Sequence, residues 1–101
     1  MADTVEVIDN QDALQFEATA EGEGAILTYR LRAGRLVLTH TEVPASLEGR
    51  GIGGKLVLAA LNRARQDGLT VVPLCPFARS WLERHPDAAG GVTIDWGDAT
   101  R

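Results

Sequence analysis

The first half of the chain alternates apolar and polar residues, which is the period of a half-buried β-strand. Three such runs cover residues 14–19, 25–32 and 35–43, and residues 3–8 form a weaker fourth run. The breaks between the runs are short and rich in turn residues, and short breaks of this kind join neighbouring antiparallel strands. The pattern therefore predicts an antiparallel meander that ends near Pro44.

After the meander the apolar period becomes that of an α-helix. Apolar residues recur every three or four positions over residues 51–67, and Gly68 follows as a typical C-terminal cap. Residues 69–72 form a short apolar run. A strand, a helix and a second strand make a right-handed crossover, so we predict that residues 69–72 pair in parallel with residues 35–43.

A second helix is predicted from Pro76 to His85, because proline suits the first helical position and His85 is followed by another proline. Alternation over residues 92–96 predicts a final strand. The second helix has an apolar face that we interpret mainly as core: Phe77, Trp81 and Leu82.

The 101 residues are 45% hydrophobic and 24% charged, with a formal net charge of −4, as in ordinary globular proteins. The acidic balance argues against a general nucleic-acid partner and mildly favours cationic partners such as amines. No apolar run is long enough for a membrane helix, no signal peptide is visible, and the single cysteine suits a reducing compartment. We expect one cytoplasmic α+β domain over residues 1–101, built on a mixed sheet, with no membrane partner.

A glycine-rich stretch, Glu48-Gly49-Arg50-Gly51-Ile52-Gly53-Gly54-Lys55, lies between the meander and the first helix. A glycine-rich turn that opens a helix predicts a phosphate site, because free amides and the helix dipole point at the ligand. The spacing also fits a dinucleotide fingerprint, but that motif belongs in a parallel doubly wound sheet. It fits a Walker-type loop as well, but Leu56 stands where a magnesium-binding Ser or Thr is needed.

The combination of four segments resembles the GNAT acetyltransferase superfamily, in its short branch without the usual N-terminal helices. The segments are His40-Thr41-Glu42-Val43-Pro44, Gly49-x-Gly51-Ile52-Gly53, Val72-Pro73-x-Cys75-Pro76-Phe77 and Leu82-x-x-His85-Pro86. The resemblance covers nearly the whole chain. It implies an acetyl-CoA-dependent N-acetyltransferase with a GNAT-like mixed sheet. No metal is expected, because no His, Cys, Asp or Glu cluster has the spacing of metal ligands.

The resemblance also implies where acetyl-CoA binds, namely where strands 35–43 and 69–72 separate. Pro44 and Pro73 support that separation, because each blocks further strand pairing. Superfamily loops usually carry Gln or Arg where this chain has Glu48, so we expect Glu48 to point away and Arg50 or Lys55 to supply positive charge. The implied binding residues are Thr41, Val43, Glu48, Gly49, Arg50, Gly51, Ile52, Gly53, Gly54, Lys55, Phe77, Arg79 and Ser80.

Three residues are candidates for the chemistry. His40 and Glu42 are predicted to share the strand face of the apolar Leu36 and Leu38, as a general base that acts directly or through water. The alternative is that they cap the sheet edge or pair with Arg30 or Arg79. Cys75 precedes the second helix, whose dipole would lower its pKa, and it is expected to accept the acetyl group or protonate the departing CoA. The alternative is a small buried hydrophobe.

The acceptor is expected to be an amine. The sequence leaves open whether it belongs to a small molecule, a lysine side chain or a protein N-terminus. A second hypothesis is a non-catalytic sensor or interaction module that binds CoA or acyl-CoA, because the helices that build the acceptor pocket in larger relatives are missing. A binder of another phosphate ligand is a weaker option. The chain is expected to be a monomer or a weak homodimer.

Overall fold

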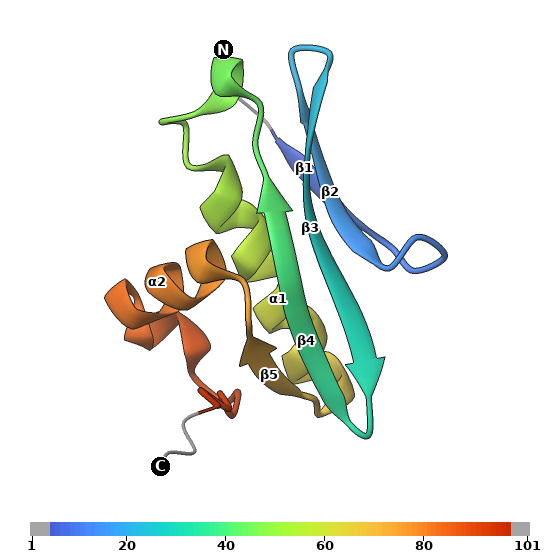
Figure 1. Cartoon of the computed structure of the whole chain (residues 1–101), viewed down its shortest axis with the longest axis vertical. Coiled ribbons are helices and arrows are strands. Elements are labelled where there is room, and N and C mark those ends of the chain that lie inside the picture. The colour runs from blue at the N-terminus through green and yellow to red at the C-terminus, as the bar shows by residue number, and fades with distance from the viewer. Residues whose placement is uncertain (1–4, 98–101) are drawn as a thin grey trace.

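The described part of the chain is built on a five-stranded sheet whose strands lie in the order in which they occur in the sequence (Figure 1). The first four strands pair antiparallel and the fifth runs parallel to the fourth. The predicted meander and the predicted parallel crossover are therefore confirmed. The computed structural model describes residues 5–97, so the first two positions of the predicted run 3–8 lie outside it. The strands are β1 (Glu6–Asn10), β2 (Gln15–Ala20), β3 (Glu23–Arg32), β4 (Arg35–Glu42) and β5 (Thr70–Pro73).

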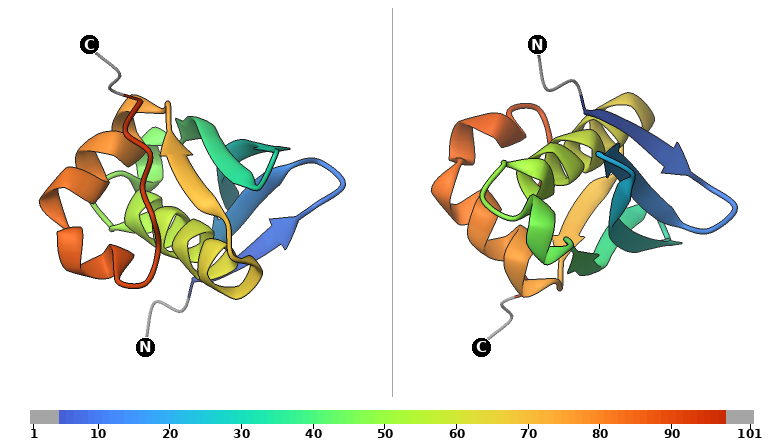
Figure 2. Two further views of the ribbon diagram at one scale, coloured as in Figure 1. Left: turned by 90° about the horizontal axis from the view of Figure 1, so that it is seen from below. Right: turned by 90° about the horizontal axis from the view of Figure 1, so that it is seen from above.

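Within residues 5–97, two α-helices and two short 3-10 helices complete the fold. Helix α1 lies across one face of the sheet and contacts β1 to β4, while α2 packs against α1 and the β4–β5 end (Figure 2). Neither α-helix has the length and apolar character needed to cross a bilayer within residues 5–97. The helices are η1 (Ala45–Leu47), α1 (Ile52–Asp67), α2 (Pro76–Arg84) and η2 (Pro86–Ala89).

The core lies between the sheet and α1. Alternate residues of β2, β3 and β4 are buried on one sheet face, as the period of two predicted, and they meet the apolar stripe of α1. The α2 helix adds Ala78 and Leu82 to this core. The predicted strand over residues 92–96 is wrong, because only Ile94 forms a bridge, with Val71.

Strands β4 and β5 separate at Pro73. The amides of Leu74 and Cys75 both donate to the Leu38 carbonyl, at 3.0 and 2.9 Å, and pairing stops there. Proline has no amide to continue the ladder, so β5 turns away into α2 while β4 runs on to Glu42. The separation leaves the last residues of β4 without a strand on that side.

A β-bulge at Thr39 changes which side chains of β4 face the core. Leu38 pairs with Tyr29 and His40 pairs with Thr28, so Thr39 is an extra residue that has no partner in β3. One extra residue reverses the alternation of faces beyond it. Thr41 therefore pairs with the buried Leu27 and faces inward.

His40 and Glu42 consequently face the opposite side of the sheet. Their side chains are 60% and 67% exposed, and His40 Nε2 lies 3.1 Å from Glu42 Oε2. The prediction that they continue the face of Leu36 and Leu38 is wrong, because the bulge inserts a residue between the two pairs.

A partly buried polar network joins β1 to α1 at the end remote from the strand separation. The Tyr29 hydroxyl donates to Asp9 Oδ1 at 2.5 Å, and Arg63 Nη1 lies 2.6 Å from Asp9 Oδ2. Burial, followed by the hydrogen bond to Asp9, raises the pKa of Tyr29 above its ordinary value. The hydrogen bond that the Arg63 guanidinium donates to Asp67 is the main cause that raises the pKa of Arg63.

Candidate functional site

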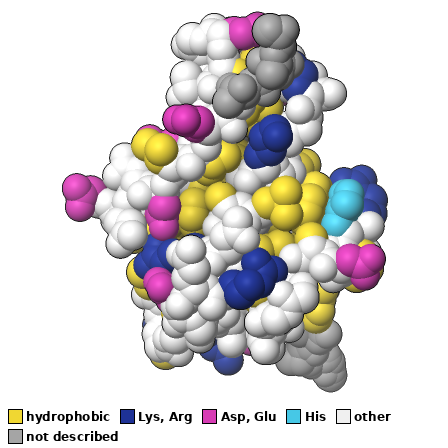
Figure 3. Space-filling model, turned by 180° about the vertical axis from the view of Figure 1, so that it is seen from behind, with side chains coloured by type: hydrophobic (Ala, Val, Ile, Leu, Met, Phe, Trp, Pro, Cys, Tyr) yellow, Lys and Arg dark blue, Asp and Glu magenta, His cyan; other side chains and the backbone are white. Residues whose placement is uncertain are grey.

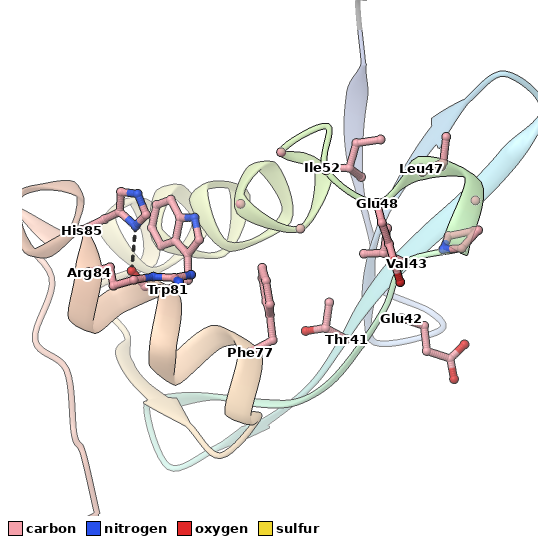
Figure 4. A pocket seen from close by; sticks show the side chains of 16 residues that line it. Thr41, Glu42, Val43, Leu47, Glu48, Ile52, Phe77, Trp81, Arg84 and His85 are labelled. Atoms are coloured by element: carbon pink, nitrogen blue, oxygen red, sulfur yellow. Dashed lines mark hydrogen bonds between the residues drawn. The ribbon is translucent and has the colours of Figure 1, made fainter.

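A cavity of about 870 Å³ lies where the end of β4, the loop after it, the start of α1 and one face of α2 meet. That volume suits a cofactor-sized ligand. Its walls come from Thr41 to Pro44, from the glycine stretch, and from one side of α2 (Figure 4). In the space-filling view from behind, a histidine and an adjacent basic side chain stand at the edge of a hydrophobic patch (Figure 3).

The start of α1 presents free backbone amides to this cavity. Gly51 is the N-cap, with a positive φ of 74°, and it supplies no capping side chain. The first helical hydrogen bond is from the Lys55 amide to the Gly51 carbonyl, at 3.1 Å. The amides of Ile52, Gly53 and Gly54 therefore have no intrahelical partner, and together with the helix dipole they form a typical site for an anion.

Two aromatic rings of α2 rest directly on the glycines of α1. A Cβ on Gly53 would lie 2.6 Å from Phe77 Cζ, and a Cβ on Gly54 would lie 2.6 Å from Trp81 Nε1. At both positions a ring occupies the space that a side chain would take, so a side chain there would displace the ring. Phe77 is 38% exposed and Trp81 is half-buried, and both line the cavity. Trp81 thus packs against the core as predicted while it also lines the cavity, and Leu82 is buried in the core as predicted. The interpretation of Phe77 as core is wrong, because its ring is exposed.

The free edge of β4 also borders the cavity. The Tyr29 amide donates to the Leu14 carbonyl, on the β2 side of β3, at 2.9 Å. Because backbone groups alternate in direction along a strand, the Leu27 amide points to the same side. Its partner Thr41 therefore directs its own amide and carbonyl away from β3, into the space that β5 leaves open.

Cys75 lies just behind this edge. Its side chain is 2% exposed, and its Sγ is 3.1 Å from the Thr41 hydroxyl oxygen, where either atom can be the donor. Cys75 is also the N-cap residue of α2, as predicted. Thr41 thus lies between the Cys75 thiol and the cavity. In Figure 4 the Thr41 hydroxyl points toward Phe77.

Comparison with known proteins identifies the family. The profile described as "GCN5-related N-acetyl-transferase" matches residues 15–90, which is most of the chain. The chain belongs to the GCN5-related N-acetyltransferase (GNAT) family. The fold class and the resemblance predicted from the sequence are confirmed by this match.

Similar proteins agree with the assignment to the GNAT family. Protein NATD1 of Gallus gallus is 31% identical over 85 residues, which cover 81% of this chain and 77% of that protein. Protein NATD1 of Homo sapiens is 33% identical over 75 residues, covering 71% and 66%. A GCN5-like protein from Staphylococcus aureus, solved by NMR in solution, has the same fold, with a TM-score of 0.69, 24% identity and full coverage of both chains.

The cavity brings together most of the residues that were predicted to bind the cofactor. Glu48 lines the cavity, although we expected it to point away. The Glu42 carboxylate points away from the aromatic side chains in Figure 4, although the residue lies at the rim. The predicted residues that line the pocket are Thr41, Glu42, Val43, Glu48, Gly49, Gly51, Ile52, Gly53, Gly54 and Phe77.

Several predicted residues of the GNAT site lie outside the pocket. Arg50 pairs with Glu21 of the β2–β3 turn at 2.8 Å, so its charge is directed to the hairpin. Arg79 donates to the Trp96 carbonyl at 2.7 Å on the far side of α2, and the expectation that it reaches the ligand is wrong for this reason. Lys55 and Ser80 are exposed and do not line the cavity, nor do His40 and Cys75.

Sequence reasoning missed part of the GNAT pocket wall. Trp81, Arg84 and His85 lie four, seven and eight positions after Phe77, which is the spacing of one helix face, so this signal was available. Gly24 comes from β3, far from the glycine stretch in sequence, and carries no local signal, whereas Leu47 directly precedes Glu48. No group of three His, Cys, Asp or Glu side chains within residues 5–97 is placed to hold a metal ion.

Proposed function

We propose that this GNAT protein binds acetyl-CoA in the cavity and transfers the acetyl group to an amine. The observation that carries the proposal is one cavity that joins the free amides of Ile52 to Gly54 with the free backbone edge at Thr41. Acetyl-CoA has a matching sequence of groups, because a pyrophosphate is linked to an amide-containing pantetheine arm that ends in the thioester.

The pyrophosphate is proposed to accept hydrogen bonds from the start of α1. The pantetheine amides would pair with the backbone of Thr41, as an added strand pairs with an open sheet edge. The thioester then lies at the strand separation, near the Thr41 hydroxyl and the Cys75 thiol. Phe77 and Trp81 form the apolar wall along this path.

Cys75 has two possible roles in this proposal. As a nucleophile, its thiolate sulfur bonds to the acetyl carbon, the bond from that carbon to the CoA sulfur breaks, and CoA leaves as a thiolate. The acceptor nitrogen then bonds to the acetyl carbon, the Cys75 sulfur leaves, and the amine loses a proton to a base. As an acid, the Cys75 thiol instead gives its proton to the departing CoA sulfur while the amine attacks directly.

His40 and Glu42 are proposed to take the proton of the amine. They flank Thr41 in sequence but project from the other face of β4, where both side chains are largely exposed. In this arrangement the amine arrives from the sheet face opposite to the cavity. The thioester lies between the amine and the cavity. A test is the rate of CoA release with an amine panel for His40→Gln and Glu42→Gln, with Glu17→Gln on the same sheet face as the control. An unchanged rate in both variants would remove them from the reaction.

Intact-mass analysis tests the binding and the role of Cys75 together. Incubation with acetyl-CoA should give bound CoA in the wild type and in Cys75→Ala, and an acetyl adduct only where Cys75 is the nucleophile. Adduct formation in Cys75→Ala would place the acetylated atom elsewhere. Failure of the wild type to bind acetyl-CoA under native conditions would refute the proposed function.

The second candidate function is a CoA-binding module without turnover. The burial of Cys75 and its contact with Thr41 favour this alternative, because a 2% exposed thiol is held away from a ligand in the cavity. Binding of acetyl-CoA without CoA release, whichever amine is offered, supports the module. Release that depends on both an amine and Cys75 or His40 supports the enzyme.

A further inference from the structure

The α2 end of the cavity carries a stacked pair of rings. The rings of Trp81 and His85 lie 4.1 Å apart between centroids, with planes 20° apart. His85 Nδ1 is 2.8 Å from the Trp81 carbonyl oxygen (Figure 4). A carbonyl only accepts, so Nδ1 carries the proton of this bond. The other ring nitrogen, Nε2, has no hydrogen-bond partner among the residues that the structure describes.

Arg84 stands beside this pair in the same wall. Its guanidinium makes no hydrogen bond or ion pair within residues 5–97, although it lines the cavity. Other arginines of the helices are engaged, because Arg63 pairs with Asp9 and Arg65 donates to the Ala88 carbonyl. Arg84 therefore brings an unused positive charge to the cavity wall, next to an unused imidazole nitrogen.

These groups lie close to the amide site of α1 but are distinct from it. Trp81 rests on the backbone of Gly54, and His85 stacks on Trp81. The cavity consequently offers two places for an anion, one at the amides of α1 and one at Arg84 and His85, with a flat aromatic side chain between them. A ligand that matches this pattern carries two phosphate groups near one another.

We propose that Arg84 and His85 bind the 3′-phosphate of CoA while the amides of Ile52 to Gly54 bind its pyrophosphate. This proposal rests on the proposed function of the cavity. CoA carries its pyrophosphate and its 3′-phosphate on the same ribose, so the two anionic groups are neighbours, as the two sites are. The guanidinium forms charge-assisted hydrogen bonds with phosphate, and the imidazole adds a further bond.

The overall charge of the chain opposes the binding of an anionic ligand. The formal net charge is −4, and Glu48 lies in the same wall, so a polyanionic ligand meets repulsion over much of the surface. Arg84 is the guanidinium that faces the ligand from this wall. The structure thus assigns to Arg84 the discrimination between CoA and its analogue without the 3′-phosphate.

The test compares CoA with 3′-dephospho-CoA by calorimetry. The wild type should bind CoA about tenfold more tightly, which is the effect of one charged hydrogen-bonded contact. Arg84→Gln should lose most of this preference and bind 3′-dephospho-CoA as the wild type does. Arg30→Gln is the matched control, because Arg30 is exposed on the sheet face opposite to the cavity. His85→Gln should reduce the preference by a smaller factor.

The outcomes separate this proposal from the one on which it rests. Equal affinity of the wild type for the two ligands, or a preference that survives in Arg84→Gln, would overturn the phosphate assignment while CoA binding stands. Absence of binding to either ligand would overturn the proposed function as well. A loss of preference in Arg30→Gln would show that overall charge, not this site, sets the discrimination.

Discussion

Replacing Gly53 with alanine tests how the Phe77 ring controls the cavity. Gly53 is the second residue of α1, and its amide belongs to the proposed pyrophosphate site. The new Cβ would lie 2.6 Å from Phe77 Cζ and 2.8 Å from Cε2, which is closer than side-chain carbons pack. The obstacle is the far end of a partly exposed side chain, so we expect the ring to move and the helix to stay in place.

The size of the effect on stability follows from two opposing contributions. The ring must withdraw by roughly 0.8 Å to restore the 3.4 Å at which contacts become ordinary. Overpacking of this kind costs about 1–3 kcal/mol, with the low end expected for an exposed ring. Alanine in place of glycine in a helix stabilises by about 1 kcal/mol. The free energy of unfolding should therefore change by no more than about 1 kcal/mol.

Ligand binding should change much more than stability. The displaced ring enters the cavity next to the α1 amides, so acetyl-CoA affinity should fall by about tenfold or more, or 1.4 kcal/mol. The assay is a double-mutant cycle with Phe77→Leu, in which urea unfolding and calorimetric acetyl-CoA binding are measured for all four proteins. If the clash is the cause, Gly53→Ala costs little affinity in the Phe77→Leu background.

Two results would refute this reasoning. An equal loss of affinity in both backgrounds would mean that the Cβ blocks the ligand directly and that the ring is not involved. A loss of stability above about 3 kcal/mol would mean that the ring cannot move, since that exceeds ordinary overpacking. Gly54→Ala is a matched comparison, because its Cβ would meet Trp81 Nε1 at the same 2.6 Å, but that ring is held by the His85 stack.

Three further predictions concern the stability of the fold. Gly51→Ala should destabilise the protein by about 1 kcal/mol in urea unfolding, because its φ of +74° is left-handed, and no change would mean that the N-cap adopts another conformation. Tyr29→Phe should cost about 1–2 kcal/mol, since Asp9 loses a donor. The raised pKa of Tyr29 also means that wild-type stability falls as the pH rises above about 10, and the variant should lack this fall. The hydrogen bond from Arg35 lowers the pKa of Asp95, so its contribution is present above about pH 4 and lost as the pH falls below it. In Asp95→Asn the free energy of unfolding should fall less as the pH drops below about 4. An unchanged pH dependence would exclude the Arg35–Asp95 pair as a source of stability.

The order of elements could be predicted because each period is a local property. The meander, the α1 helix with its Gly68 cap, the parallel β5 and the α2 helix from Pro76 all follow from spacing within one segment. Alternation over residues 92–96 is just as regular, yet only Ile94 pairs, and with a strand whose other partner is already β4. A local period indicates that a segment can form a strand but does not supply its partner.

The bulge could not be predicted from β4 alone for a related reason. An extra residue is defined only by the strand opposite, and Thr39 looks like any other position in an alternating run.

The side of α2 that faces the cavity could have been predicted better. Arg79 lies across the helix from the face shared by Phe77, Trp81 and Arg84, so helical spacing alone distinguishes the two arginines.

The bulge and the strand separation together decide which residue meets Cys75. Without the extra residue at Thr39, the imidazole of His40 would face inward, into a space where the thiol is 2% exposed and packed among core side chains. The bulge places the small Thr41 hydroxyl there instead and sends His40 and Glu42 to the open face of the sheet. An amine that uses either of them must therefore approach from that open face, while the cavity proposed to hold acetyl-CoA lies on the side of the helices. The gap between β4 and β5 is where the two approaches meet.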